Sequence, residues 1–138
     1  MSSLSPSVEE TVYPSPKAVR PERLTVAKPW GNFEQLTLNE ATTVKIITVL
    51  PDEELSLQSH KLRSEWWIVL ENSMEVVLDD QTKIIKAGDE MFIPQGAKHR
   101  AVGLRQSCRW LEISFGHFDE KDIERFSDKY GRAPTEGL

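Results

Sequence analysis

The feature that most constrains this chain is a succession of short apolar segments closed by turn residues, which begins near residue 34. Residues 43–49 (TVKIITV) are rich in β-branched side chains, 66–70 (WWIVL) are continuously apolar, and 108–115 (CRWLEISF) alternate polar and apolar positions. Turn signals recur roughly every eight to twelve residues, which is typical of all-β domains. The pattern therefore predicts an all-β fold, a small jelly-roll barrel.

The two ends of the chain lack this alternation. Residues 1–25 are rich in Ser, Pro and Glu and show no periodicity, so they predict an irregular N-terminal arm. Residues 26–132 would form the barrel domain, and 133–138 a C-terminal tail. A helix is expected within 118–131, where acidic residues come first, Ile123 and Phe126 are three apart, and Gly131 follows.

Composition limits the partners and the compartment. The chain has 138 residues with a formal net charge of −5 and no run of Lys or Arg, which argues against nucleic acid or an anionic membrane as a partner. It begins without a secretory signal and has no stretch of roughly 20 apolar residues. Its single cysteine excludes an internal disulfide and a cysteine-rich zinc site. We expect a soluble, cytoplasmic protein.

Four polar residues could form a metal site. Gln58, His60 and Glu65 lie at the entrance of the apolar run 66–70, and His99 follows a Pro-x-Gly turn. Glu65 has the opposite strand parity to His60, so it shares the same face only if the chain turns or bulges around 63–64. Two imidazoles, a carboxylate and an amide oxygen suit zinc, iron, manganese or nickel. A solitary His at such a place is more often solvated, but the two segments together are more specific.

These segments resemble the cupin motifs, His-x-His followed by Glu, and Gly-x5-Pro-x-Gly-x2-His. His60, Glu65, Gly88 and His99 match, whereas Leu62 stands where the second His would be. The runs KPWGNFEQL, LSLQSHKLRSEWW and DIERFSDKYGR are similar to the cupin domain of type II phosphomannose isomerases, over about residues 28–132. That domain is often half of a bifunctional protein with a nucleotidyltransferase, and here we expect it to stand alone.

The resemblance implies a metal-dependent isomerase that interconverts mannose 6-phosphate and fructose 6-phosphate through an enediol. It implies one divalent ion, usually zinc, held by Gln58, His60, Glu65 and His99, with Arg63 as a functional basic residue. Cupins of this kind commonly form homodimers, and the N-terminal arm could supply an exchanged strand.

The residues themselves add further candidates. A sugar phosphate needs a cationic partner, and Lys45, Arg100 and Arg132 could supply it beside Arg63. Arg100 follows His99 directly and would point to the other face of a regular strand. Glu112 alternates with apolar residues and is a second candidate acid or base, with an inward or an outward position equally open.

Two alternatives to the isomerase stay open, and the loss of a strong ligand at Leu62 favours the first of them. The first is a non-catalytic cupin that binds a sugar or a sugar nucleotide. The second is an Fe(II)-dependent oxygenase that uses His60, Glu65 and His99, since two histidines and a carboxylate also serve that chemistry.

Overall fold

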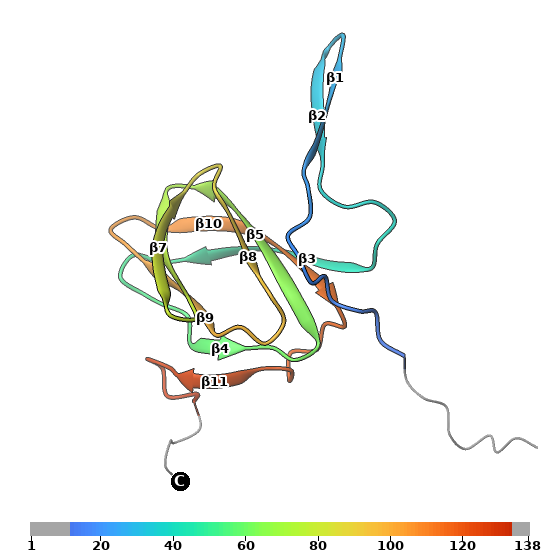
Figure 1. The fold of residues 1–138 in the computed structure, drawn as a ribbon. Helices are drawn as coiled ribbons and strands as arrows, with labels where there is room; N and C mark the ends of the chain where they lie inside the picture. The colour runs from blue at the N-terminus through green and yellow to red at the C-terminus, as the bar shows by residue number, and fades with distance from the viewer. Residues whose placement is uncertain (1–11, 134–138) are drawn as a thin grey trace, which may run out of the picture.

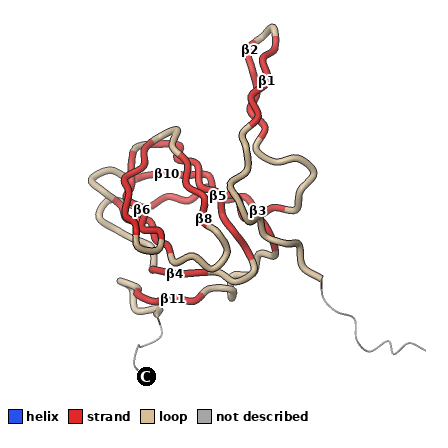
Figure 2. The backbone as a smooth tube through the Cα atoms, viewed as in Figure 1, coloured by secondary structure: helices blue, strands red, loops and turns tan. Residues whose placement is uncertain are grey.

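The computed structural model describes residues 12–133, and all of the helix or strand structure in that range is β-strand (Figures 1 and 2). The strands are β1 (Leu24–Lys28), β2 (Gly31–Gln35), β3 (Thr42–Val49), β4 (Leu57–Ser59), β5 (Arg63–Glu71), β6 (Ser73–Leu78), β7 (Gln81–Lys86), β8 (Glu90–Ile93), β9 (His99–Gly103), β10 (Cys108–Gly116) and β11 (Glu124–Ser127).

The strands from β3 onward form two antiparallel sheets that face each other. One sheet has the order β3-β10-β5-β8, and the other has the order β11-β4-β9-β6-β7. The hairpin of β6 and β7 turns at Asp79 and Asp80, where Leu78 pairs with Gln81. The prediction of an all-β jelly-roll barrel is confirmed.

The space between the sheets is filled by apolar side chains from nearly every strand. Trp67 and Trp110 lie there with ring centroids 5.0 Å apart, and Met74 and Val76 reach them from the facing sheet. Trp66 points the other way, into a smaller cluster with Ile113 and Phe115. Because successive residues of β5 alternate between these two clusters, the strand is buried on both faces, as its continuous apolar run predicts.

The hairpin formed by β1 and β2 stands away from the barrel (Figure 1). Trp30, at its turn, is 73% exposed. Residues 1–11 of the expected arm and 134–138 of the expected tail lie outside the described residues. The described part of that arm is irregular up to Leu24, where β1 begins.

The expected C-terminal helix is wrong: this segment forms β11. Its first residues make a turn instead, in which the Asp119 side chain accepts a hydrogen bond from the Lys121 amide and the Asp119 carbonyl accepts one from the Asp122 amide. Short Asp side chains compete with helix hydrogen bonding in this way. β11 then pairs with β4 and covers the edge of the sheet.

In residues 12–133 we find no helix with the length and apolar character needed to cross a membrane. A cytoplasmic location stays a prediction.

Candidate metal centre

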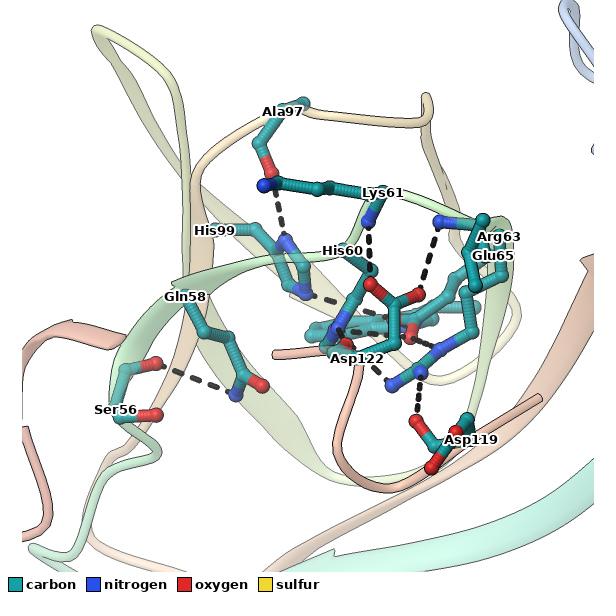
Figure 3. A network of polar contacts seen from close by, with 12 residues as sticks. Ser56, Gln58, His60, Lys61, Arg63, Glu65, Ala97, His99, Asp119 and Asp122 are labelled. Carbon is teal, nitrogen blue, oxygen red and sulfur yellow. Dashed lines mark hydrogen bonds and ion pairs between the residues drawn. The ribbon is translucent and has the colours of Figure 1, made fainter. Parts of the chain in front are cut away.

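His60, Glu65 and His99 meet inside the barrel, from three different elements (Figure 3). Glu65 lies between the imidazoles, with its Oε2 atom 3.4 Å from His60 Nε2 and its Oε1 atom 3.5 Å from His99 Nε2. One ligand atom from each residue lies within 4.8 Å of the other two. The three side chains are almost wholly buried, so their polar atoms contact one another in place of water.

A turn between β4 and β5 brings His60 and Glu65 together. The Asp122 carboxylate accepts hydrogen bonds from the amides of Lys61 and Leu62, at 2.8 and 2.9 Å. The chain therefore changes direction at these two residues, ahead of Arg63, where β5 begins. The predicted change of parity exists, but it is a side-chain-stabilised turn at 61–62 and not a bulge at 63–64.

Both imidazoles are oriented by backbone carbonyls. His60 Nδ1 lies 2.7 Å from the Asp122 carbonyl, and His99 Nδ1 lies 3.0 Å from the Ala97 carbonyl. Donation from each Nδ1–H leaves the Nε2 lone pair directed at Glu65, the arrangement usual for histidine ligands. Burial, together with the Arg63 charge, lowers the pKa of His60 to about 4, although the Glu65 charge opposes this. His60 is therefore neutral at pH 7 and available as a ligand.

Two buried carboxyl groups have opposite pKa shifts. For Glu65, burial alone raises the pKa, but His99, His60 and Arg63 outweigh it and the net shift is downward. Burial, and then the Glu65 charge, raise the pKa of Glu112 to about 8. Glu112 lines the inner cavity and so faces the interior, one of its two predicted positions. Its raised pKa leaves it mostly protonated at pH 7, so it can donate a hydrogen bond.

Arg63 is the cation nearest to this group. Its Nε donates to Glu65 Oε2 at 3.0 Å, and its Nη2 lies 3.2 Å from His60 Nε2. The guanidinium carbon lies 4.4 Å from the centroid of the Phe118 ring. Because a guanidinium only donates hydrogen bonds, its contact with His60 uses the same lone pair that a metal ion would use.

The donor set fits a divalent ion. A cavity of about 100 Å³ is lined by Gln58, His60, Arg63, Glu65, His99 and Glu112, together with apolar side chains. Gln58 donates through Nε2 to the Ser56 carbonyl at 3.4 Å, which leaves its amide oxygen free to act as a ligand. Leu62 is not among the lining residues. The centre could thus hold an ion through two imidazoles, a carboxylate and an amide oxygen, with the identity of the metal left open.

The three predicted phosphate partners do not gather at this centre. Lys45 lies nearest, because it pairs with Glu112 across β3 and β10, and its Nζ is 4.1 Å from the Phe118 ring centroid. Arg100 points to the other face and pairs with Glu54 at 2.9 Å, as its parity predicts. Arg132 lies outside the barrel, paired with Asp128. Of these, the structure brings Lys45 alone close to the metal centre.

Sequence reasoning missed the residues that orient the ligands. Asp122 and Ala97 act through backbone and carboxylate oxygens, and Phe118 covers Arg63. Trp67, assigned to the core, also donates from Nε1 to Glu65 Oε1 at 3.0 Å. Of these residues, Trp67 alone could have been predicted to contact Glu65, because it lies two residues later on the same face of β5.

Comparison with known proteins identifies the family to which these motifs belong. Residues 17–128 match the family described as mannose-6-phosphate isomerase C-terminal. The chain is 36% identical over 109 residues to a mannose-1-phosphate guanylyltransferase of Salmonella montevideo, covering 78% of this chain and 23% of that protein. It is 37% identical over 114 residues to the alginate biosynthesis protein AlgA of Pseudomonas putida, covering 81% of this chain and 24% of that protein. This chain therefore spans about a quarter of the length of these relatives.

Solved structures support the fold. Oxalate decarboxylase from Bacillus subtilis superimposes with a TM-score of 0.60 at 21% identity, covering 72% of this chain and 27% of that one. At this identity the likeness establishes the cupin-like barrel and nothing further.

The comparisons correct the expected activity. The Salmonella relative is named for guanylyl transfer to mannose 1-phosphate and the Pseudomonas relative for alginate biosynthesis, and neither is named as an isomerase. The expectation that this chain is a mannose-6-phosphate isomerase is therefore wrong. The findings favour the non-catalytic alternative.

Proposed function

This chain belongs to the mannose-6-phosphate isomerase C-terminal family, and on that premise we propose that it is a non-catalytic cupin that binds a sugar or a sugar nucleotide. The ligand would be recognised at the inner centre formed by His60, Glu65 and His99. A divalent ion, with zinc as the first choice, would be held by these residues and Gln58.

The observation that carries the proposal is how little free space the centre leaves for a reacting sugar, and that Arg63 already contacts two of its donor residues. The position of the second cupin His is Leu62, outside the cavity lining, and Arg63 already contacts both His60 and Glu65. The cavity of about 100 Å³ is also small beside the roughly 300–1,000 Å³ of most small-molecule pockets. It suits an ion and one polar group of a ligand, and not a whole sugar that must react.

The centre has polar groups that would bind this one polar group of a ligand. A bound metal would polarise a ligand oxygen. The protonated Glu112 would donate a hydrogen bond to a sugar hydroxyl, and Arg63 and Lys45, which both lie over the Phe118 ring, would attract a phosphate. The name of the Salmonella relative supports mannose phosphates and guanosine-linked mannose as the first ligands to test.

Calorimetry on the zinc-loaded full chain tests the proposal, with mannose 1-phosphate and GDP-mannose as ligands. We expect saturable binding of at least one of them, weakened about tenfold or more in Arg63→Gln, because that variant loses the charged hydrogen-bond donor. Arg109→Gln is the matched control, since Arg109 pairs with Glu71 on the surface.

A parallel measurement tests for the absence of catalysis. The same zinc-loaded protein is incubated with fructose 6-phosphate in D2O and followed by NMR. We expect no deuterium incorporation and no mannose 6-phosphate. Turnover would overturn the proposal, and so would a metal-loaded protein that binds neither mannose ligand.

A further inference from the structure

A second pocket lies on the outside of the barrel, where the turn after β4 meets the segment that leads into β11. It has a volume of about 420 Å³ and is lined by Lys61, Lys121, Arg125 and Arg132, among others. Four basic side chains around one hollow are unusual in a chain whose net charge is −5.

The acidic residues nearby offset part of this positive charge, since the lining has four basic and two acidic side chains. Arg132 is paired with Asp128 at 2.8 Å. The carboxylate of Asp122, which also lines the pocket, accepts hydrogen bonds from two backbone amides. Within residues 12–133, no ion pair is formed by Lys61, Lys121 or Arg125, and Glu124 is the other acidic residue of the lining.

Arg125 adds an independent observation. Its Nε atom is buried and has no hydrogen-bond partner among the described residues. Arg125 also makes no ion pair within residues 12–133, so the charge of its guanidinium remains available to an anion in the pocket.

The pocket is separate from the metal centre. The two cavities share no lining residue, since Gln58 and His60 line the inner one and Ser59 and Lys61 line the outer one. Asp122 stands between them, with its carbonyl 2.7 Å from His60 Nδ1.

We infer that this outer pocket, which we name the basic pocket, binds the phosphate or diphosphate group of a small molecule. A guanidinium offers paired donors to phosphate oxygens and lysines add mobile charge, so Arg125 with Lys61 and Lys121 forms a suitable set. A hollow of about 420 Å³ suits a small anion rather than a nucleic acid strand, which the net charge of −5 would also repel. The inference is independent of what binds at the metal centre.

The test uses the full chain as purified, titrated with inorganic phosphate and with pyrophosphate, and read by the NMR shifts of its backbone amides. We expect saturable shifts at Lys61, Asp122 and Arg125, with pyrophosphate binding more tightly than phosphate. In the double variant Lys61→Gln/Arg125→Gln the dissociation constant should rise at least tenfold.

The matched control is Lys83→Gln/Arg105→Gln, which removes the same charge from two exposed residues outside the pocket. It should bind pyrophosphate as the wild type does. Equal weakening in both double variants would reduce the effect to net charge and overturn the inference. Shifts that do not saturate, or that centre on His99 instead, would overturn it too.

Discussion

Asp122 joins the C-terminal segment to the metal centre through three hydrogen bonds. Its carboxylate accepts from the amides of Lys61 and Leu62, and its carbonyl lies 2.7 Å from His60 Nδ1. A single residue thereby determines where the turn after β4 lies and how the His60 ring is oriented. Such indirect partners are typically needed for full metal affinity.

We predict that Asp122→Ala lowers the free energy of unfolding by about 2 kcal/mol, because two backbone amides lose a charged acceptor. Zinc affinity should fall about 10–100-fold, because without the carboxylate the segment that carries the Asp122 carbonyl is no longer tied to the turn that carries His60, and the ring loses its fixed orientation. Urea unfolding and zinc titration measure the two effects. The control Asp80→Ala, on an exposed turn, should change neither. Unchanged zinc affinity in a destabilised Asp122→Ala protein would contradict the positioning role.

At this scale the sequence predicted the grouping of His60, Glu65 and His99 better than the residues that support it. His60, Glu65 and His99 could be predicted because the two cupin motifs place them in a fixed order in an all-β chain. Asp122 could not, since it lies 62 residues from His60 in the chain and acts partly through its backbone carbonyl. Nor did the sequence determine the position of Glu112, because strand alternation alone leaves inward and outward faces equally open.

At the scale of elements, the segment after β10 shows how tertiary context overrides local pattern. Its spacing of Ile123 and Phe126 suits a short helix, but β4 is a strand of three residues with an open edge. Pairing with β11 supplies the hydrogen-bond partners for that edge. A contact of Lys98 Nζ with the Phe126 ring, 4.2 Å from its centroid, adds to this pairing. Local periodicity carries no information about which strand edges need a partner. The other strands of the barrel could be predicted because their sequences alternate and end at turn residues.

Glu90 holds the N-terminal arm against β8. It accepts hydrogen bonds from Arg20 at 2.7 Å, from Arg23 at 2.9 Å and from Trp66 Nε1 at 2.8 Å. Burial alone raises the pKa of Glu90, but these donors outweigh it and the net shift is downward. The arm is thus fastened to the barrel by an ionised carboxylate.

We predict that Glu90→Gln lowers the free energy of unfolding by about 1–2 kcal/mol at pH 7. Because the pKa is lower in the folded state, this contribution is complete above the ordinary value of 4.5 and disappears as the pH falls through the folded value. Urea unfolding of both proteins from pH 7 to pH 3 should show their difference shrinking. The control is Glu75→Gln, because Glu75 has no ion pair among the described residues, and it should show no such difference. A difference in unfolding free energy between wild type and Glu90→Gln that did not change with pH would contradict the role of the ionised Glu90.

At the scale of the whole molecule, the hairpin of β1 and β2 pairs with no other strand of residues 12–133. A two-stranded ribbon is marginally stable in water by itself. Trp30 at its turn is 73% exposed, and Val44 and Ile46, on the outer face of the edge strand β3, are each 55% exposed. These apolar surfaces favour the expected homodimer, in which the hairpin of one copy would cover the outer sheet face of the other.

We predict a mass of about twice 15.8 kDa by light scattering on a sizing column. Trp30→Ala should shift the protein toward the monomer, because it removes the largest exposed apolar side chain of the hairpin. Ile84→Ala, at a site on β7 that is 64% exposed, should leave the dimer intact. A wild-type monomer at micromolar concentration would contradict the expectation.

The most direct test of the central claim, a metal centre at His60, Glu65 and His99, is elemental analysis after zinc loading and desalting. We predict about one zinc per chain in the wild type. The variant His117→Ala should bind the same amount, because the His117 imidazole stacks on Tyr13 outside the centre. The double variant His60→Ala/His99→Ala should retain none while remaining folded. A folded wild-type protein that retains no zinc, or a double variant that retains as much as the wild type, would contradict the account.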